Sequence, residues 1–136
     1  MRPFIGDRAM PESVKSLLES ANAAVPRISA DEARTLVAER DALLLDVRDP
    51  AEIAASGKLA GAVNVPRGML EFRADAATPY HLPELRTDRP VVVYCASGGR
   101  SALAGQTLQA MGYGEVRNLG GFKDASAAGF EVEPGA

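Results

Sequence analysis

The pattern of apolar and polar positions predicts alternating strands and helices from residue 26 onward. Residues 42–47 and 91–94 are almost continuously apolar, which is typical of strands buried on both faces of a parallel sheet. Shorter strands are expected within residues 61–66 and near Val116. This order of elements favours an α/β protein with helices on both faces of a mostly parallel sheet.

Capping sequences mark where the predicted helices begin. Ser29 and Glu32 have the spacing of a capping box, which predicts a helix over residues 30–39. Asp49 followed by Pro50 predicts a second, short helix that ends near Gly57. A third is expected over residues 101–111, and a last helical turn after residue 121. Residues 79–90 contain three prolines and little periodicity, so they are expected to form an irregular connection.

The first 25 residues stand apart from this alternation. Val14, Leu17, Leu18, Ala21 and Val25 recur at helical spacing and predict an amphipathic helix that ends before residue 26, with its first turn at residues 11–12. We therefore predict a helical extension over residues 1–25 and an α/β domain over residues 26–136. The pattern leaves two roles open for the helix, packing on the domain or binding a partner or a second copy.

Length, composition and charge exclude several classes of protein. The 136 residues suffice for one domain, and 46% apolar with 24% charged residues excludes a disordered chain. The net charge of −3 and the absence of Trp argue against nucleic-acid and anionic-membrane partners. Membrane-length apolar runs are absent, and Asp7 and Arg8 lie where a signal peptide would be apolar. A cytoplasmic location is expected.

The single cysteine is the residue that needs an explanation. With one Cys and one His, the chain cannot build an internal disulfide or a Cys/His zinc site, and a lone thiol fits a reducing compartment. Cys95 follows the apolar run 91–94, and ligands of α/β sheets bind at the carboxyl ends of strands. The alternative reading is a small buried side chain without chemistry.

The residues after Cys95 favour the chemical reading. Gly98 and Gly99 let backbone N–H groups turn inward just before a helix, which predicts an anion cradle that lowers the pKa of the thiol. A cation such as Arg100 is unfavourable at the positive end of the helix dipole, so its presence there is best explained if it binds an oxyanion. Ser101 would cap the helix or bind the same anion. A solvated surface arginine is the simpler alternative for Arg100.

Over residues 28–130, the sequence resembles the single-domain rhodaneses, a family of sulfurtransferases. The segments that carry the resemblance are Asp46-Val47-Arg48 with Glu52 and Gly57, residues 61–66, residues 95–101 and residues 119–121. The resemblance implies a three-layer α/β/α fold with a central, mostly parallel sheet of five strands. It also implies a thiosulfate sulfurtransferase type of enzyme that works through a cysteine persulfide and uses no cofactor.

The resemblance assigns roles residue by residue. Cys95 would be the nucleophile, and Arg100 would bind the anionic end of a donor such as thiosulfate. The acceptor would be cyanide or a thiol, including a protein thiol. The persulfide would be surrounded by the backbone amides of the loop, which are those of Ala96, Ser97, Gly98, Gly99, Arg100 and Ser101. Asp46, Arg48 and Glu52 would support the loop through charge pairs.

Some features depart from the family or leave rivals open. Lys58-Leu59 stands where the family often has His-Ile, and Phe122 where it often has Trp. A cysteine phosphatase or arsenate reductase is one rival, but the phosphatase pattern has five residues between Cys and Arg, and here four separate Cys95 from Arg100. The other rival is a rhodanese fold that serves as a non-catalytic binding or sulfur-relay module. His81 is expected to pack locally or at the surface.

Overall fold

A parallel sheet of four strands forms the centre of the molecule. The structure is a computed structural model that describes residues 11–135; residues 1–10, with Asp7 and Arg8, and residue 136 lie outside the described residues. The sheet order is β4-β2-β5-β6. Its strands are β2 (Leu43–Asp46), β4 (Val63–Asn64), β5 (Val91–Cys95) and β6 (Val116–Gly121).

Helices follow or connect these strands, and the longer ones come in the order that the sequence predicts. They are α1 (Val14–Ala24), α2 (Ala30–Arg40), α3 (Pro50–Ser56), the 3-10 turn η1 (Arg67–Met69), α4 (Leu70–Ala74), α5 (Gly99–Ala110) and α6 (Phe122–Ala127). A small antiparallel pair is formed by β3 (Lys58–Leu59) and β7 (Val132–Glu133).

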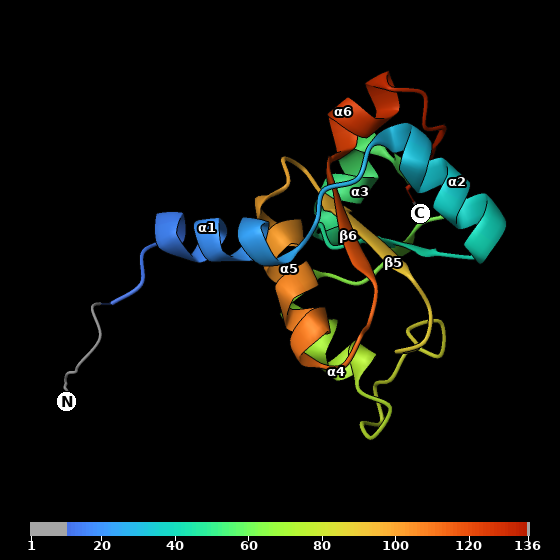
Figure 1. Ribbon diagram of the computed structural model, residues 1–136. Coiled ribbons are helices and arrows are strands. Elements are labelled where there is room, and N and C mark those ends of the chain that lie inside the picture. Colours follow the sequence, from blue (N-terminus) through green and yellow to red (C-terminus); the bar gives the residue numbers. More distant parts are fainter. Residues whose placement is uncertain (1–10, 136) are drawn as a thin grey trace, which may run out of the picture.

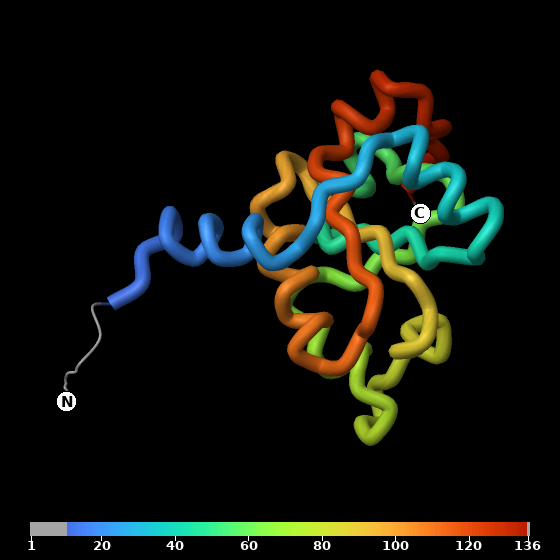
Figure 2. The backbone as a smooth tube through the Cα atoms, viewed as in Figure 1, coloured from blue at the N-terminus to red at the C-terminus, as the bar shows by residue number. Residues whose placement is uncertain are grey.

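The sheet lies between two layers of helices (Figures 1 and 2). Leu43 and Leu45 of β2 pack into one core with Leu108 of α5, whereas Leu44 and Val92 point into a second core with residues of α2 and α6. This alternation explains why both strands are continuously apolar, since every position faces a helix layer. The three-layer α/β/α prediction is confirmed.

The sheet has four strands rather than the five that were expected. In place of the fifth strand, Arg27 forms a single parallel bridge with Asn118 of β6. The Asn118 N–H donates to the Pro26 carbonyl at 2.9 Å, and the Ile28 N–H donates to the Asn118 carbonyl at 3.1 Å. Because proline has no N–H, the pairing does not extend further toward the N-terminus through Pro26.

Helix boundaries agree with the caps more closely than with the apolar pattern. The Ser29–Glu32 capping box begins α2, and the predicted pair of Asp49 and Pro50 begins α3. The first helix begins at Val14, after the residues 11–12 expected in its first turn, because Ser13 forms its cap. Short elements such as α4 and the β3–β7 pair were not predicted, since they are too brief to show a period.

The first helix projects from the domain and contacts it through its C-terminal end (Figure 1). Ala21 and the following Val25 are fully buried, whereas Val14 and Leu17 are exposed. A Cβ added at Gly105 of α5 would lie 2.9 Å from Val25 Cγ1, so this glycine permits the close approach. Among residues 11–135, no helix combines the length and apolar character needed to cross a membrane.

Gly57 provides a stability test with a matched control. Gly57 and Gly61 both have a φ of +82°, but a Cβ at Gly57 would lie 2.7 Å from the Glu133 carbonyl oxygen, whereas a Cβ at Gly61 meets nothing within 4 Å. We expect Gly57→Ala to lower the free energy of unfolding by about 1–3 kcal/mol more than Gly61→Ala. Urea unfolding of both variants measures the difference, and equal losses would contradict the steric explanation.

Candidate active site

Cys95 ends β5, and its sulfur lies at the beginning of α5. The side chain is buried, with 1% of its surface exposed. The Gly98 N–H donates to Sγ at 3.0 Å and the Ser101 N–H at 3.4 Å, while the Ser101 hydroxyl oxygen lies 3.4 Å from Sγ. The loop therefore aims backbone N–H groups at the sulfur, as the glycines in it predicted.

The environment of Cys95 shifts its ionisation toward the thiolate. Burial opposes ionisation, but it is outweighed by the N–H groups of Ser101, Gly98 and Ser97 and by the Ser101 hydroxyl when its hydrogen turns toward the sulfur, and together these lower the pKa of Cys95. A lowered pKa at a helix N-terminus is typical of a reactive cysteine. Ala96 and Ser97 are exposed, so this side of the loop is open to solvent.

The two glycines of β6 allow the strand to approach the loop. Cys95 pairs with Gly121 across the sheet. A Cβ at Gly121 would lie 2.8 Å from the Ala96 carbonyl oxygen, and one at Gly98, whose φ is +103°, would lie 3.4 Å from the Gly120 Cα. Larger residues at these positions would push β6 and the loop apart.

Ser101 does not cap α5, which corrects one of the two roles expected for it. The N-cap is Gly98, which has no side chain to offer. The fully buried Ser101 hydroxyl donates to Asn118 Oδ1 at 2.8 Å. Asn118 was not anticipated as a site residue. The only signal for it in the sequence is an amide between the apolar Val116 and Leu119 of a buried strand.

Arg100 forms a two-point ion pair with Glu52 of α3. The two N–O distances are 2.7 Å and 2.9 Å, and about a third of each side chain is exposed. Hydrogen bonds from the Arg100 guanidinium and from the Asp49 N–H lower the pKa of Glu52 to about 2. The Glu52 carboxylate correspondingly raises the pKa of Arg100. The arginine expected to meet the donor anion is thus held by a carboxylate in this structure.

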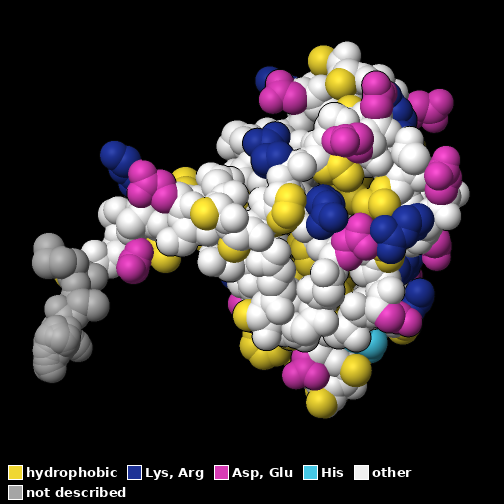
Figure 3. Space-filling model, in the orientation of Figure 1, with side chains coloured by type: hydrophobic (Ala, Val, Ile, Leu, Met, Phe, Trp, Pro, Cys, Tyr) yellow, Lys and Arg dark blue, Asp and Glu magenta, His cyan; other side chains and the backbone are white. Residues whose placement is uncertain are grey.

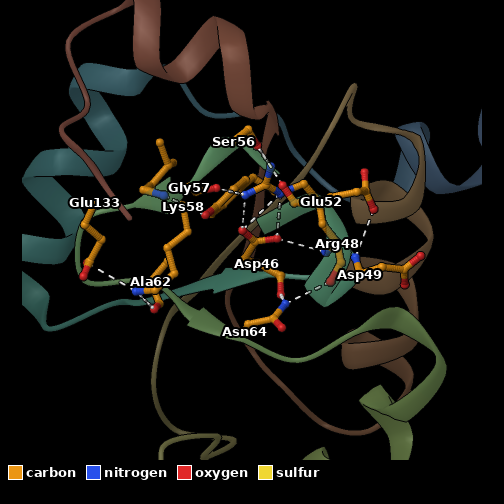
Figure 4. Close-up of polar contacts among 12 residues, drawn as sticks. Asp46, Arg48, Asp49, Glu52, Ser56, Gly57, Lys58, Ala62, Asn64 and Glu133 are labelled. Atoms are coloured by element: carbon orange, nitrogen blue, oxygen red, sulfur yellow. Dashed lines mark hydrogen bonds and ion pairs between the residues drawn. The ribbon is translucent and has the colours of Figure 1, made fainter. Parts of the chain in front are cut away.

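Asp46 and Arg48 form a second ion pair, and this one is buried (Figure 4). Arg48 Nη2 lies 2.8 Å from Asp46 Oδ2 and also donates to the Gly57 carbonyl at 2.7 Å, while Nη1 donates to the Ser56 hydroxyl at 3.0 Å. The guanidinium lies 4.2 Å from the centre of the Phe122 ring. Burial opposes the charged form, but Asp46 outweighs it and raises the pKa of Arg48.

A pocket of about 390 Å³ lies beside the loop. It is lined by Arg48, Glu52, Ala55, Ser56, Ala96, Phe122 and Lys123. A larger hollow of about 710 Å³ includes His81 and Tyr113 and lies where the chain enters β5, at the opposite end of that strand from Cys95. The His81 ring contacts the Leu85 carbonyl at 3.0 Å, so it packs locally and away from the sulfur. On the face drawn in Figure 3, charged side chains of both signs are interspersed.

Comparisons with known proteins identify the family to which this arrangement is related. Residues 29–128 match the family model of the rhodanese-like domain. A sulfurtransferase of Allochromatium vinosum is 42% identical over 81 residues, which are 60% of this chain and 67% of that protein. The human thiosulfate:glutathione sulfurtransferase is 35% identical over 106 residues, 73% of this chain and 90% of its own length. The match to an uncharacterized Bacillus subtilis protein spans only 60% of that relative.

A solved structure shares the fold over nearly the whole chain. It is a Rhodopseudomonas palustris protein of unknown function, described as a possible tyrosine phosphatase, with a TM-score of 0.83 and 37% identity over 93% of this chain and 98% of its own.

The Glu52–Arg100 pair predicts a defined pH dependence of stability. The pKa of Glu52 is lowered from 4.5 to about 2, so the pair stabilises the fold fully above about pH 4.5 and is lost as the pH falls through about 2. Because solvent screens the pair, we expect Glu52→Gln to cost about 1 kcal/mol at pH 7. Urea unfolding across this range should show the difference from the parent chain shrinking toward zero at low pH. A constant difference would contradict the ion-pair explanation.

Proposed function

Because the chain belongs to the rhodanese-like domain family, we propose that it is a thiosulfate sulfurtransferase that carries sulfane sulfur as a persulfide on Cys95. Its relatives include sulfurtransferases, which supports the transferase class. The observation that carries the proposal is the Cys95 sulfur itself, which is held by the N–H groups of Gly98 and Ser101 at the start of α5 and has a lowered pKa.

The reaction consists of two displacements at sulfur. The Cys95 thiolate attacks the outer sulfur of the donor, a new S–S bond forms, and the donor S–S bond breaks. For thiosulfate, the electron pair of that bond leaves with sulfite. An acceptor thiolate or cyanide then attacks the outer sulfur of the persulfide and regenerates the Cys95 thiolate. No net oxidation or reduction of the protein occurs in this cycle.

The loop stabilises the anionic species on this path. The persulfide, like the thiolate, carries negative charge, and the N–H groups already directed at Sγ are preorganised to bind it. Ser97 and Ala96 lie on the exposed rim, where donor and acceptor approach. We assign the pocket beside Ala96 to these molecules, with Lys123 as its exposed cation.

A donor sulfonate at Arg100 would meet a guanidinium that already binds Glu52. Two of the five guanidinium N–H donors, one on each Nη, bind the two carboxylate oxygens. We propose that an anionic donor shares Arg100 with Glu52 or displaces Glu52 from it. The ion pair then weakens donor binding. The pair also keeps Arg100 ordered beside the loop when no donor is bound.

The phosphatase rival is the second candidate that an observation supports, because the Rhodopseudomonas palustris neighbour is described as a possible tyrosine phosphatase. Four residues separate Cys95 from Arg100, one fewer than in the phosphatase pattern, and the resulting ring suits one sulfur atom better than a tetrahedral phosphoryl group. Hydrolysis of p-nitrophenyl phosphate that depends on Cys95 would reverse this ranking.

The persulfide on Cys95 should be detectable as a covalent intermediate. Incubation with thiosulfate should add one sulfur atom, about 32 Da, to Cys95, and cyanide or dithiothreitol should remove it, since both are thiophilic acceptors. Intact-protein mass spectrometry measures the adduct. Cys95→Ser should abolish both the adduct and turnover, because a hydroxyl cannot form a persulfide. If neither thiosulfate nor a protein persulfide loads the thiol, the sulfurtransferase proposal fails and the non-catalytic module remains.

Substitutions at Arg100 and Glu52 should have opposite effects on the use of thiosulfate. Arg100→Ala should lower kcat/KM for thiosulfate by about 30- to 1000-fold, because it removes a donor to the developing sulfite charge. Glu52→Gln should instead lower the KM for thiosulfate about fivefold, because it releases the arginine. A neutral sulfane-sulfur donor controls for general damage and should respond weakly to both changes. If thiosulfate kinetics are the same in Arg100→Ala, the arginine has no role in donor binding.

A further inference from the structure

Asn118 of β6 is a buried amide whose orientation is fixed by two backbone groups. Its side chain lies behind the active-site loop, with 1% of the residue exposed. Oδ1 accepts from the Gly120 N–H at 2.9 Å, and Nδ2 donates to the Gly98 carbonyl at 3.2 Å. Turning the amide over would place two donors against each other at Gly120 and two acceptors at Gly98. The oxygen therefore faces Ser101.

This orientation decides where the Ser101 hydrogen points. An amide oxygen only accepts, so the 2.8 Å contact between Ser101 Oγ and Asn118 Oδ1 requires the hydroxyl to donate to Asn118. Serine has one hydroxyl hydrogen, and the side of Oγ that faces Cys95 Sγ at 3.4 Å then presents lone pairs. Such an oxygen accepts an S–H from the neutral thiol and does not stabilise a thiolate.

We propose that Asn118 is a positioning residue that holds the Ser101 hydroxyl hydrogen away from Cys95 in the thiol state and thereby restrains the sulfur as a nucleophile. When Cys95 ionises, the hydroxyl turns from Asn118 to the sulfur. Oδ1 keeps the Gly120 N–H as a partner after that turn, so neither oxygen is left without a hydrogen bond. The inference deepens the proposed function, on which it rests for the role of Cys95 as nucleophile.

The backbone of Asn118 is fixed from outside the segment that matches the family model. Its N–H donates to the Pro26 carbonyl at 2.9 Å, and its carbonyl accepts from the Ile28 N–H and from Arg27 Nε, both at 3.1 Å. The family match begins at residue 29. Residues 26–28 therefore place the amide that controls Ser101, which ties the N-terminal segment to the chemistry of the loop.

The effect of Asn118 can be separated from that of nearby charges. Cys95 interacts electrostatically with Arg100, which Glu52 neutralises from α3. On or beside β2 and β6 and in residues 26–28, the other charged side chains are Asp46 and Arg48, which pair with each other, Arg117, which pairs with Glu115, and Arg27, which binds backbone carbonyls. None of these contacts involves the Asn118 side chain, so substitutions of that side chain leave them in place.

The test measures the pKa of the Cys95 thiol in the donor-free protein, from thiolate absorbance near 240 nm. The chain has one Cys and three Tyr, so subtraction of the Cys95→Ser titration isolates the thiol. Asn118→Ala frees the Ser101 hydroxyl to donate to sulfur and should lower this pKa by about 0.5 to 1 unit. Asn118→Asp keeps the acceptor and adds negative charge, and should raise it by about 1 unit or more. A general loosening of the loop would move both variants in the same direction.

A double mutant shows whether Asn118 acts through Ser101. In the Ser101→Ala background, Asn118→Ala should leave the Cys95 pKa unchanged. Circular dichroism and urea unfolding verify that each variant folds, and Asn118→Ser replaces the alanine variant if that one does not, with the same expected direction. The inference is overturned if Asn118→Ala does not lower the pKa, or lowers it equally without the hydroxyl. Because no donor is present, the pKa result stands apart from the test for sulfur transfer.

Discussion

The buried guanidinium of Arg48 is the constraint on which the arrangement of the site depends. A charge removed from water is costly unless it is paired and its N–H groups are bonded. Asp46 at the end of β2 supplies the carboxylate, and the Ser56 hydroxyl and Gly57 carbonyl supply the remaining acceptors at the end of α3. Meeting these needs fixes α3 against the sheet. Breaking the pair would leave a buried charge and release that helix.

The position of α3 then determines the charge around the loop. Glu52 lies on this helix and binds Arg100 on α5, so the ion pair joins the helix fixed by Arg48 to the helix that begins at the loop. With Arg100 neutralised in this way, the attraction for negative charge at Sγ comes mainly from oriented N–H groups. Such dipoles need no free cation and no metal, which is how a chain with a net charge of −3 can stabilise a thiolate.

The sequence predicts best where one physical requirement acts on neighbouring residues. Burial on both faces leaves a continuous apolar run in β2 and β5, and a helix start needs a cap within three residues, as at Ser29. Cys95 could be singled out because the residues of its loop follow it directly in the sequence. The partner of Arg100 could not be predicted, because Glu52 is 48 positions away and a sequence pattern does not show which carboxylate a guanidinium reaches. The place of Asn118 in the site could not be predicted for the same reason, since its contact with Ser101 depends on the register of β5 and β6.

The N-terminal segment and the site share one core, although the sequence separates them. Val25 is fully buried in the same cluster as Cys95, and it fills the space that Gly105 of α5 leaves open. A Cβ added at Gly99 would lie 3.6 Å from Leu18 Cδ2 of α1, so that helix passes beside the first turn of α5. The split into an extension over residues 1–25 and a domain over residues 26–136 stays a prediction. In the structure, α5 is held between β5 and the segment before residue 29. The position of the first turn of α5, which holds the sulfur, therefore depends on β5 and on that segment.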